Sequence, residues 1–352
     1  MRIARIALMA AYIIPFTLLS ACSEKENKAP TVEIVNPVDG ARLLQGDIVA
    51  VKAMAEDEDG SITELKIYVE GDEVASAETS TLIYNWNTAG LEVGEYVLSA
   101  AAKDDENEFV AVNNTVLLDS PGGLNPDLDY GLLSDIDGNN YATIEIGSQT
   151  WMAENLKVSH YADGTPITQI SDEGEWNAMT IDVQAYCWYD NLTENSDTSG
   201  ALYTWAAAMN GALSSDTIPS GIQGVCPDGW HLPSDAEWKV LEMFLGMNQT
   251  DANSYDWRGS DEGGQLKETG FSKWDISNSG GSNLSGFTAI PGGFRSNKGL
   301  YFSAGQTAAF WTSKQEEGAD KAWYRTVNFD KEQVYRQYHF MQLGLSVRCI
   351  KD

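Results

Sequence analysis

Few residues of this chain are arranged for catalysis or for zinc binding. The four cysteines form no C-x-x-C pair, and His160, His231 and His339 lie far apart in the sequence, so a zinc site is not indicated. No Cys–His pair with an orienting third group is evident, which argues against nucleophilic catalysis. His231 is expected to be a buried or a strand-end histidine. The sequence therefore predicts no catalytic residue, and we expect a protein that is not an enzyme.

Clustered carboxylates supply the candidate metal site. Asp57 and Asp59 precede Gly60 in an acidic turn, and Ca²⁺ is a hard cation that takes carboxylate and carbonyl oxygens. Two carboxylates alone do not make a site, so Asp104 and Asp105 would have to converge from another loop. The alternative is a solvated acidic turn. A structural Ca²⁺ ion is the one cofactor that the sequence suggests.

Tryptophan supplies the candidate ligand contacts. The chain contains 11 Trp residues, and exposed Trp rings are amphipathic faces that can stack on sugar rings. Trp257, Trp274 and Trp323 lie in polar, loop-like segments and are the predicted ligand-binding residues, with a core position as the alternative for each. The Trp residues that fall in apolar patterns, or in the motifs of the second module described below, are expected in the core: Trp151, Trp188, Trp205, Trp230, Trp238 and Trp311.

The first residues carry a secretion signal. Arg2 and Arg5 precede an apolar stretch at 6–19, which fits a secretory signal and is shorter than the roughly 20 residues of a membrane-spanning helix. Ser20 and Ala21 before Cys22 resemble a lipobox, in which the Cys thiol is acylated and becomes the mature N-terminus. An ordinary cleaved signal with a chance Cys is the alternative. We expect a signal peptide at 1–21, followed by the lipidated Cys22 and a polar tether at 22–30.

The tether residues suggest where the lipid anchor places the protein. Ser23 after the Cys resembles sorting to an outer membrane, and the acidic residues Glu24 and Glu26 resemble surface-export signals of Bacteroidetes-type lipoproteins. A multiply acylated Cys anchors stably in a membrane. The expected location is the outer membrane, lipid-anchored through Cys22, with the protein facing the cell surface.

Composition limits the partners of the folded part. Removing residues 1–21 leaves 331 of 352 residues, enough for two or three domains. It also removes two basic residues and no acidic ones, which changes the formal charge from −30 to −32. Charge of this sign argues against nucleic acid as a partner. An aromatic content of 10% excludes a disordered chain, and 32 Gly residues indicate a loop-rich β architecture.

Residues 31–118 show the pattern of an all-β domain. Short alternating segments are each closed by turn residues, which predicts a β-sandwich. Their order resembles that of bacterial immunoglobulin-like modules of cell-surface proteins. Such modules usually act as spacers or adhesive repeats. The segments that carry the resemblance are 37–40, 55–62, 86–88, 94–96 and 102–104.

A linker with two Pro and three Gly at 119–131 precedes a second module at 132–352. Its motifs resemble the Fibrobacter succinogenes major paralogous domain, a family found across Bacteroidetes and Fibrobacteres. The resemblance indicates the fold of the module and the location of the protein more clearly than it indicates an activity. The matching segments are 135–139, 146–156, 161–167, 185–190, 200–205, 226–238, 286–295, 310–313 and 345–352.

Local patterns in the second module predict an α+β fold with few helices. Ser234 and Glu237 form a capping box that opens a helix at 234–245, and Leu202 to Met209 suggests a shorter second helix. The segment 135–139 is expected to be a hairpin turn, because its spacing excludes an EF-hand loop.

Segments 231–238 and 345–348 also resemble C-type-lectin-like and sulfatase-modifying proteins. That fold implies that the C-terminal strand pairs with the N-terminal strand of the module. With three cysteines left after lipidation, at most one bridge can form within the chain. Cys226–Cys349 is the preferred disulfide and Cys187–Cys226 the alternative.

Three functions remain open from the sequence. The first is a surface lipoprotein whose second module binds a ligand such as a glycan, with the immunoglobulin-like module as spacer. The second is a structural or adhesive envelope protein that binds a protein partner. The third, and least favoured, is an enzyme that acts on an extracellular polymer.

Overall fold

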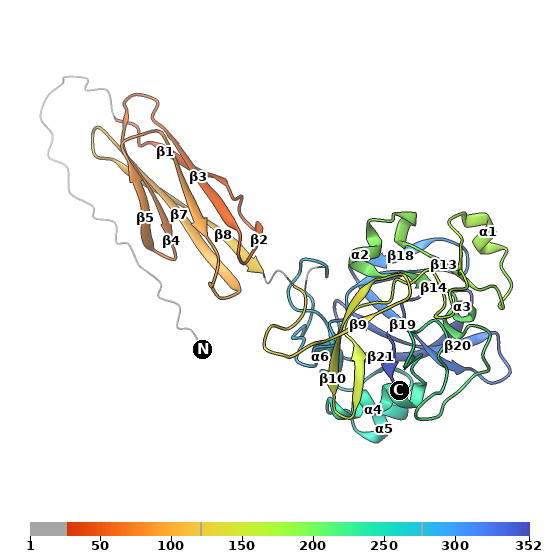
Figure 1. The fold of residues 1–352 in the computed structure, drawn as a ribbon. Coiled ribbons are helices and arrows are strands. Elements are labelled where there is room, and N and C mark those ends of the chain that lie inside the picture. The colour runs from red at the N-terminus through yellow and green to blue at the C-terminus, as the bar shows by residue number, and fades with distance from the viewer. Residues whose placement is uncertain (1–26, 120–121, 276) are drawn as a thin grey trace, which may run out of the picture. The chain divides into compact units, whose positions relative to one another are not determined.

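The computed structural model describes residues 27–119, 122–275 and 277–352. Strands β1–β8 and strands β9–β22 form separate sheets, and we call these two sets the first and the second module (Figure 1). Cys22 and the predicted signal peptide lie outside the described residues. Within the described ranges, no helix combines the length and the apolar character needed to cross a bilayer.

Alternating apolar residues build the first module as two sheets, ordered β1-β3-β6 and β2-β8-β7-β4-β5. On β3, Val51, Ala53 and Ala55 are buried, because successive side chains of a strand point to opposite faces. The rings of Trp86 on β6 and Tyr96 on β7 meet 5.3 Å apart between the two sheets. The predicted immunoglobulin-like sandwich is confirmed. Its strands are β1 (Thr31–Asn36), β2 (Arg42–Leu44), β3 (Ile48–Glu56), β4 (Ile62–Val69), β5 (Asp72–Ala77), β6 (Thr81–Asn87), β7 (Gly94–Asp104) and β8 (Phe109–Asp119).

The second module contains a five-stranded sheet β15-β22-β11-β10-β9, a three-stranded sheet β12-β13-β14 and a six-stranded sheet β16-β21-β20-β19-β17-β18. Short helices lie between the strands (Figure 1). The strands are β9 (Gly131–Ser134), β10 (Asn140–Ile146), β11 (Gln149–Met152), β12 (Thr168–Gln169), β13 (Ala185–Cys187), β14 (Leu202–Tyr203), β15 (Trp230–His231), β16 (Asp256–Arg258), β17 (Gly292–Arg295), β18 (Tyr301–Ala304), β19 (Thr307–Gln315), β20 (Lys321–Asn328), β21 (Val334–Phe340) and β22 (Ile350–Lys351). The helices are α1 (Glu173–Asn177), α2 (Asn195–Ser199), α3 (Trp205–Met209), α4 (Asp235–Phe244), α5 (Gln249–Asn253) and α6 (Glu262–Leu266), with a 3-10 turn η1 (Tyr189–Asn191).

Two local predictions in this module are confirmed. Strands β9 and β10 form an antiparallel hairpin, and the Asp135 carboxylate accepts hydrogen bonds from two backbone N–H groups of its turn, at 2.9 Å each. Ser234 and Glu237 form the capping box at the start of α4, with Oγ accepting from the Glu237 N–H and Oε2 accepting from the Ser234 N–H. The predicted second helix is shorter than expected, because Leu202 belongs to strand β14.

The C-terminal strand β22 pairs with β11 and β15. The expectation that it pairs with the first strand of the module is wrong. Strands β9, β10 and β11 form an antiparallel meander with β10 in the middle. One edge of β11 is therefore paired with β10, and its other edge pairs with β22. The resemblance to C-type lectins stays a prediction.

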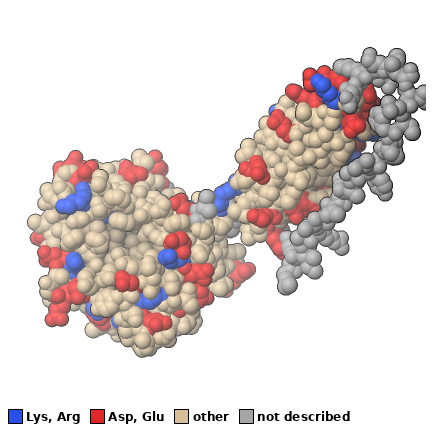
Figure 2. Space-filling view, turned by 180° about the vertical axis from the view of Figure 1, so that it is seen from behind, with Lys and Arg blue, Asp and Glu red and all other residues tan. Residues whose placement is uncertain are grey.

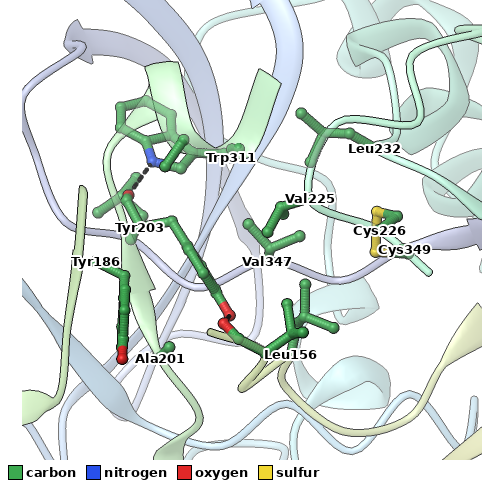
Figure 3. Close-up of a cluster of buried hydrophobic side chains, with 14 of the residues drawn as sticks. Leu156, Tyr186, Ala201, Tyr203, Val225, Cys226, Leu232, Trp311, Val347 and Cys349 are labelled. Carbon is green, nitrogen blue, oxygen red and sulfur yellow. Dashed lines mark hydrogen bonds between the residues drawn. A yellow bond between two sulfur atoms is a disulfide. The ribbon is translucent and has the colours of Figure 1, made fainter. Parts of the chain in front are cut away.

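A disulfide joins Cys226 to Cys349 beside this sheet, across a sequence separation of 123 residues (Figure 3). Both cysteines are buried in a cluster of apolar side chains that includes Trp311, whose indole N–H donates to the Tyr203 carbonyl at 2.8 Å. Cys187, the alternative partner, is a buried free thiol on β13. Burial raises the pKa of this thiol, which disfavours the reactive thiolate.

Candidate ligand-binding cleft

The two faces of the six-stranded sheet carry different kinds of side chain. On three neighbouring strands, β16, β21 and β20, an aromatic residue is followed directly by an arginine. Because adjacent side chains of a strand point to opposite faces, all three aromatic rings lie on one face and all three arginines on the other. The pairs are Trp257–Arg258, Tyr335–Arg336 and Tyr324–Arg325.

The arginine face is fixed to helix α4 by buried ion pairs. Asp235 accepts two hydrogen bonds from Arg336, at 2.8 Å each, and pairs with Arg325 at 2.8 Å. Glu242 pairs with Arg325 and Arg258, both at 2.7 Å. Burial alone would raise the pKa of Asp235, but the guanidinium groups outweigh it and hold that pKa far below its usual value. The carboxylate therefore stays ionised and holds the strands against the helix.

The aromatic face is open and forms a cleft of about 370 Å³, within the range of small-molecule binding sites. The rings of Trp257 and Tyr335 lie 5.1 Å apart, and those of Tyr335 and Tyr324 lie 6.1 Å apart. Small side chains on the adjacent strands leave the hollow between the rings. The cleft is lined by Trp257, Phe294, Thr307, Ala309, Tyr324, Thr326, Tyr335, His339, Leu343 and Leu345.

The lining of the cleft is uncharged at neutral pH. Burial, helped by Asp256, raises the pKa of both Tyr324 and Tyr335, so the two phenols stay protonated. Burial and the Lys321 ammonium lower the pKa of His339, so its imidazole is neutral. The Nδ1 atom of His339 accepts from the backbone N–H of the next residue at 2.8 Å, which leaves the ring proton on Nε2. The cleft thus combines aromatic faces with neutral hydrogen-bonding groups.

Of the three predicted ligand-binding tryptophans, the structure places one in the cleft. Trp257 is half-buried on its wall. The prediction that Trp274 and Trp323 present exposed faces is wrong, since they are only 2% and 3% exposed. Trp274 donates its indole N–H to the Ala289 carbonyl. Trp323 lies on the arginine face of β20, with the Arg336 guanidinium 4.0 Å from its ring centroid.

The acidic turn of the first module connects β3 to β4. Asp57 Oδ1 accepts the Asp59 backbone N–H at 3.1 Å, and Asp105 reaches the same loop, where it accepts the Ser61 backbone N–H at 2.9 Å. Nowhere in the described ranges do three or more His, Cys, Asp or Glu side chains gather as a metal-binding group. The Ca²⁺ ion at Asp57 and Asp59 stays a prediction.

The cleft residues on β17, β20 and β21 were not among the predicted ligand contacts. Tyr324, Tyr335 and Phe294 carry no motif that marks them as ligand contacts. The available signal was the repeated aromatic–arginine dipeptide in alternating segments, which places one residue type on each face of a sheet. His231, by contrast, lies where it was expected, buried on β15 between Glu237 and Asp352.

These features define a modular, β-rich protein with an immunoglobulin-like module and a second module that carries an aromatic cleft. Residues 144–351 match the family model of the Fibrobacter succinogenes major domain, and residues 30–100 match that of a bacterial Ig domain. The chain belongs to the Fibrobacter succinogenes major domain family. The two domains fit a surface adhesion or binding protein, and neither is a typical catalytic domain. No curated protein matched the chain.

Several solved structures are similar over part of the chain. The fibronectin(III)-like modules of Clostridium thermocellum CbhA are 23% identical, with a TM-score of 0.22 over 26% of this chain and 45% of theirs. The PKD1 domain of Vibrio anguillarum Epp is 19% identical, with a TM-score of 0.20 over 27% of this chain and 100% of its own.

A Bacteroides ovatus protein from a mixed-linkage glucan utilization locus, SGBP-B in complex with a mixed-linkage heptasaccharide, is 10% identical. Its TM-score is 0.19 over 42% of this chain and 52% of its own. The chain spans less than half the length of the first of these structures. Likeness at this level carries no argument about function.

Proposed function

We propose that this protein is a cell-surface lipoprotein whose second module binds a glycan in the aromatic cleft, with the first module as a spacer. The observation that carries the proposal is the open row of Trp257, Tyr335 and Tyr324 on one face of the six-stranded sheet. Sugar rings present C–H faces together with hydroxyl groups, and aromatic residues with a polar end suit such a mixed surface. A binding role needs no catalytic group.

Charge narrows the class of ligand. Figure 2 shows Asp and Glu side chains spread over the visible surface, with fewer Lys and Arg, in agreement with the formal charge of −30. The residues that line the cleft include no Lys or Arg. An anionic polymer would therefore be repelled by the protein as a whole and would find no countercharge in the cleft.

Binding is tested with the purified chain on immobilised neutral and acidic polysaccharides. We expect retention on at least one neutral polysaccharide and a loss of at least about tenfold in affinity in Trp257→Ala. Tyr255→Ala is the matched control, because Tyr255 is 54% exposed and packs against Trp323, on the other face of the sheet. Retention that is equal in both variants would contradict the assignment of the cleft.

The location at the cell surface is a separate part of the proposal and rests on the residues around Cys22. Labelled fatty acid should enter the wild-type protein and be absent from Cys22→Ser. Protease added to intact cells should release the second module while a periplasmic control protein stays protected. A module that resists the protease under those conditions would place the protein inside the envelope and contradict a role in surface adhesion.

A further inference from the structure

The aromatic residues of the cleft continue beyond its lining to the far edge of the sheet. Phe294 on β17 and Phe302 on β18 are register partners, so they lie on the same face, and their rings stack 5.7 Å apart with an interplanar angle of 29°. Phe294 lines the cleft, and Phe302, on the edge strand β18, is 45% exposed. The aromatic surface therefore continues past the end of the cleft.

Five of the six strands thus contribute one partly exposed aromatic ring to the same face. The remaining strand, β19, contributes the small residues Thr307 and Ala309 between the two groups of rings. We call this set the aromatic row: Trp257, Tyr335, Tyr324, Phe294 and Phe302. Six strands at a spacing of about 4.8 Å give the row a length of about 24 Å across the strands.

We infer that the ligand is the interior of a linear, neutral polysaccharide that lies across the strands along the aromatic row. This inference rests on the proposed function and specifies its substrate class. A single sugar or a chain end would occupy one group of rings and leave the other unused. A chain of several sugars would contact Trp257 at one end, cross the low floor at Thr307 and Ala309, and reach Phe302 at the other.

The chemistry of the row also favours a polymer without charge. Its phenols are protonated and the His339 ring beside it is neutral, so the hydrogen-bonding groups can serve hydroxyls as donors and as acceptors. Two groups of rings separated by a hollow suit a chain of bulky rings better than an extended peptide. A peptide would need an unpaired strand edge for its backbone, whereas the row crosses the face of a sheet.

Affinity as a function of chain length tests the inference. The probes are gluco-, manno-, xylo- and malto-oligosaccharides of one to six units, titrated calorimetrically into the full chain. For the series that binds, we expect Kd to fall by at least about tenfold between the dimer and the hexamer, because the longer chain reaches the second group of rings. Phe302→Ala should weaken the hexamer by about fivefold or more and leave the dimer unchanged, whereas Trp257→Ala should weaken both.

Phe244→Ala is the matched control for Phe302→Ala, because Phe244 is a Phe that is 62% exposed on α4, outside the aromatic row. Thermal unfolding of each variant confirms that it folds. If affinity reaches its limit at the monomer or dimer and Phe302→Ala binds the hexamer normally, the inference is overturned while glycan binding stands. If oligogalacturonate, which is anionic, binds as tightly as the neutral oligosaccharides, the inference that the ligand is uncharged is overturned. If no series binds, the proposed function fails, and this inference fails with it.

Discussion

A single substitution at Asp235 should strongly lower the stability of the second module. Its buried carboxylate pairs with the guanidinium groups of Arg325 and Arg336, all within 2.8 Å. Asp235→Asn keeps the size of the side chain and removes its charge. The two guanidinium groups then remain buried with less countercharge, which costs about 3–5 kcal/mol in comparable sites. For a module of this size the loss corresponds to a fall in Tm of roughly 6–20 °C.

The measurement is chemical denaturation of wild type, Asp235→Asn and Asp330→Asn. The last is the control, because Asp330 is an exposed carboxylate whose pairing to Lys331 spans 3.6 Å, and such pairs contribute less than about 1 kcal/mol. The pKa of Asp235 is lowered on folding. Its contribution is therefore fully present above the unfolded pKa and declines only as the pH falls through the folded value, so the cost of the substitution should not vary between about pH 5 and pH 8. A loss below about 1 kcal/mol would refute the reasoning.

Three further outcomes follow from the same structure. Replacing both Cys226 and Cys349 by Ala should cost about 4.9 kcal/mol by the loop-entropy relation for the separation of 123 residues, measured by denaturation with and without reductant. Burial lowers the pKa of His231, but its two carboxylate partners outweigh that and raise it, so its stabilisation is complete below the unfolded pKa of about 6.5 and is lost as the pH rises through the folded value. The free energy of unfolding of wild type minus that of His231→Gln should therefore be larger at about pH 5.5 than at about pH 9. Trp323→Ala should lower the free energy of unfolding by about 3–5 kcal/mol, and Trp257→Ala should lower it by about 1 kcal/mol. The denaturation midpoints of the two variants would show this difference.

Sequence reasoning succeeded where the cause of a structure is local. The turn at Asp135 and the cap at Ser234 depend on hydrogen bonds within a few residues, and residue type with spacing is enough to recognise them. The pairing of strands that lie far apart in the sequence is harder to predict from the sequence. The edge of β11 accepts β22 only because β10 already occupies the other edge, and no short motif encodes that choice.

The predictions for Trp274 and Trp323 failed for a related reason. Trp323 and Tyr324 are adjacent aromatic residues in a polar segment, and in a strand they point to opposite faces. A shift of one residue in the register would exchange the core ring for the cleft ring. Trp274 lies among Gly, Ser and Asn, yet the loop places it against the Ala289 carbonyl. Neither outcome can be derived without knowing which sheet the segment joins.

The alternation of aromatic and arginine residues connects the stability of the module to its candidate function. Each of the strands β16, β21 and β20 carries its arginine into the ion pairs with α4 and its aromatic ring into the cleft. Strand pairing sets the spacing of the rings, and the three guanidinium groups around two carboxylates hold the paired strands against α4. Ion pairs with fixed geometry suit this purpose better than apolar packing, which tolerates small shifts of a strand. An α4 face rebuilt with apolar residues should leave the rings in register, because strand pairing sets that register, and should change only how firmly the sheet is held against α4.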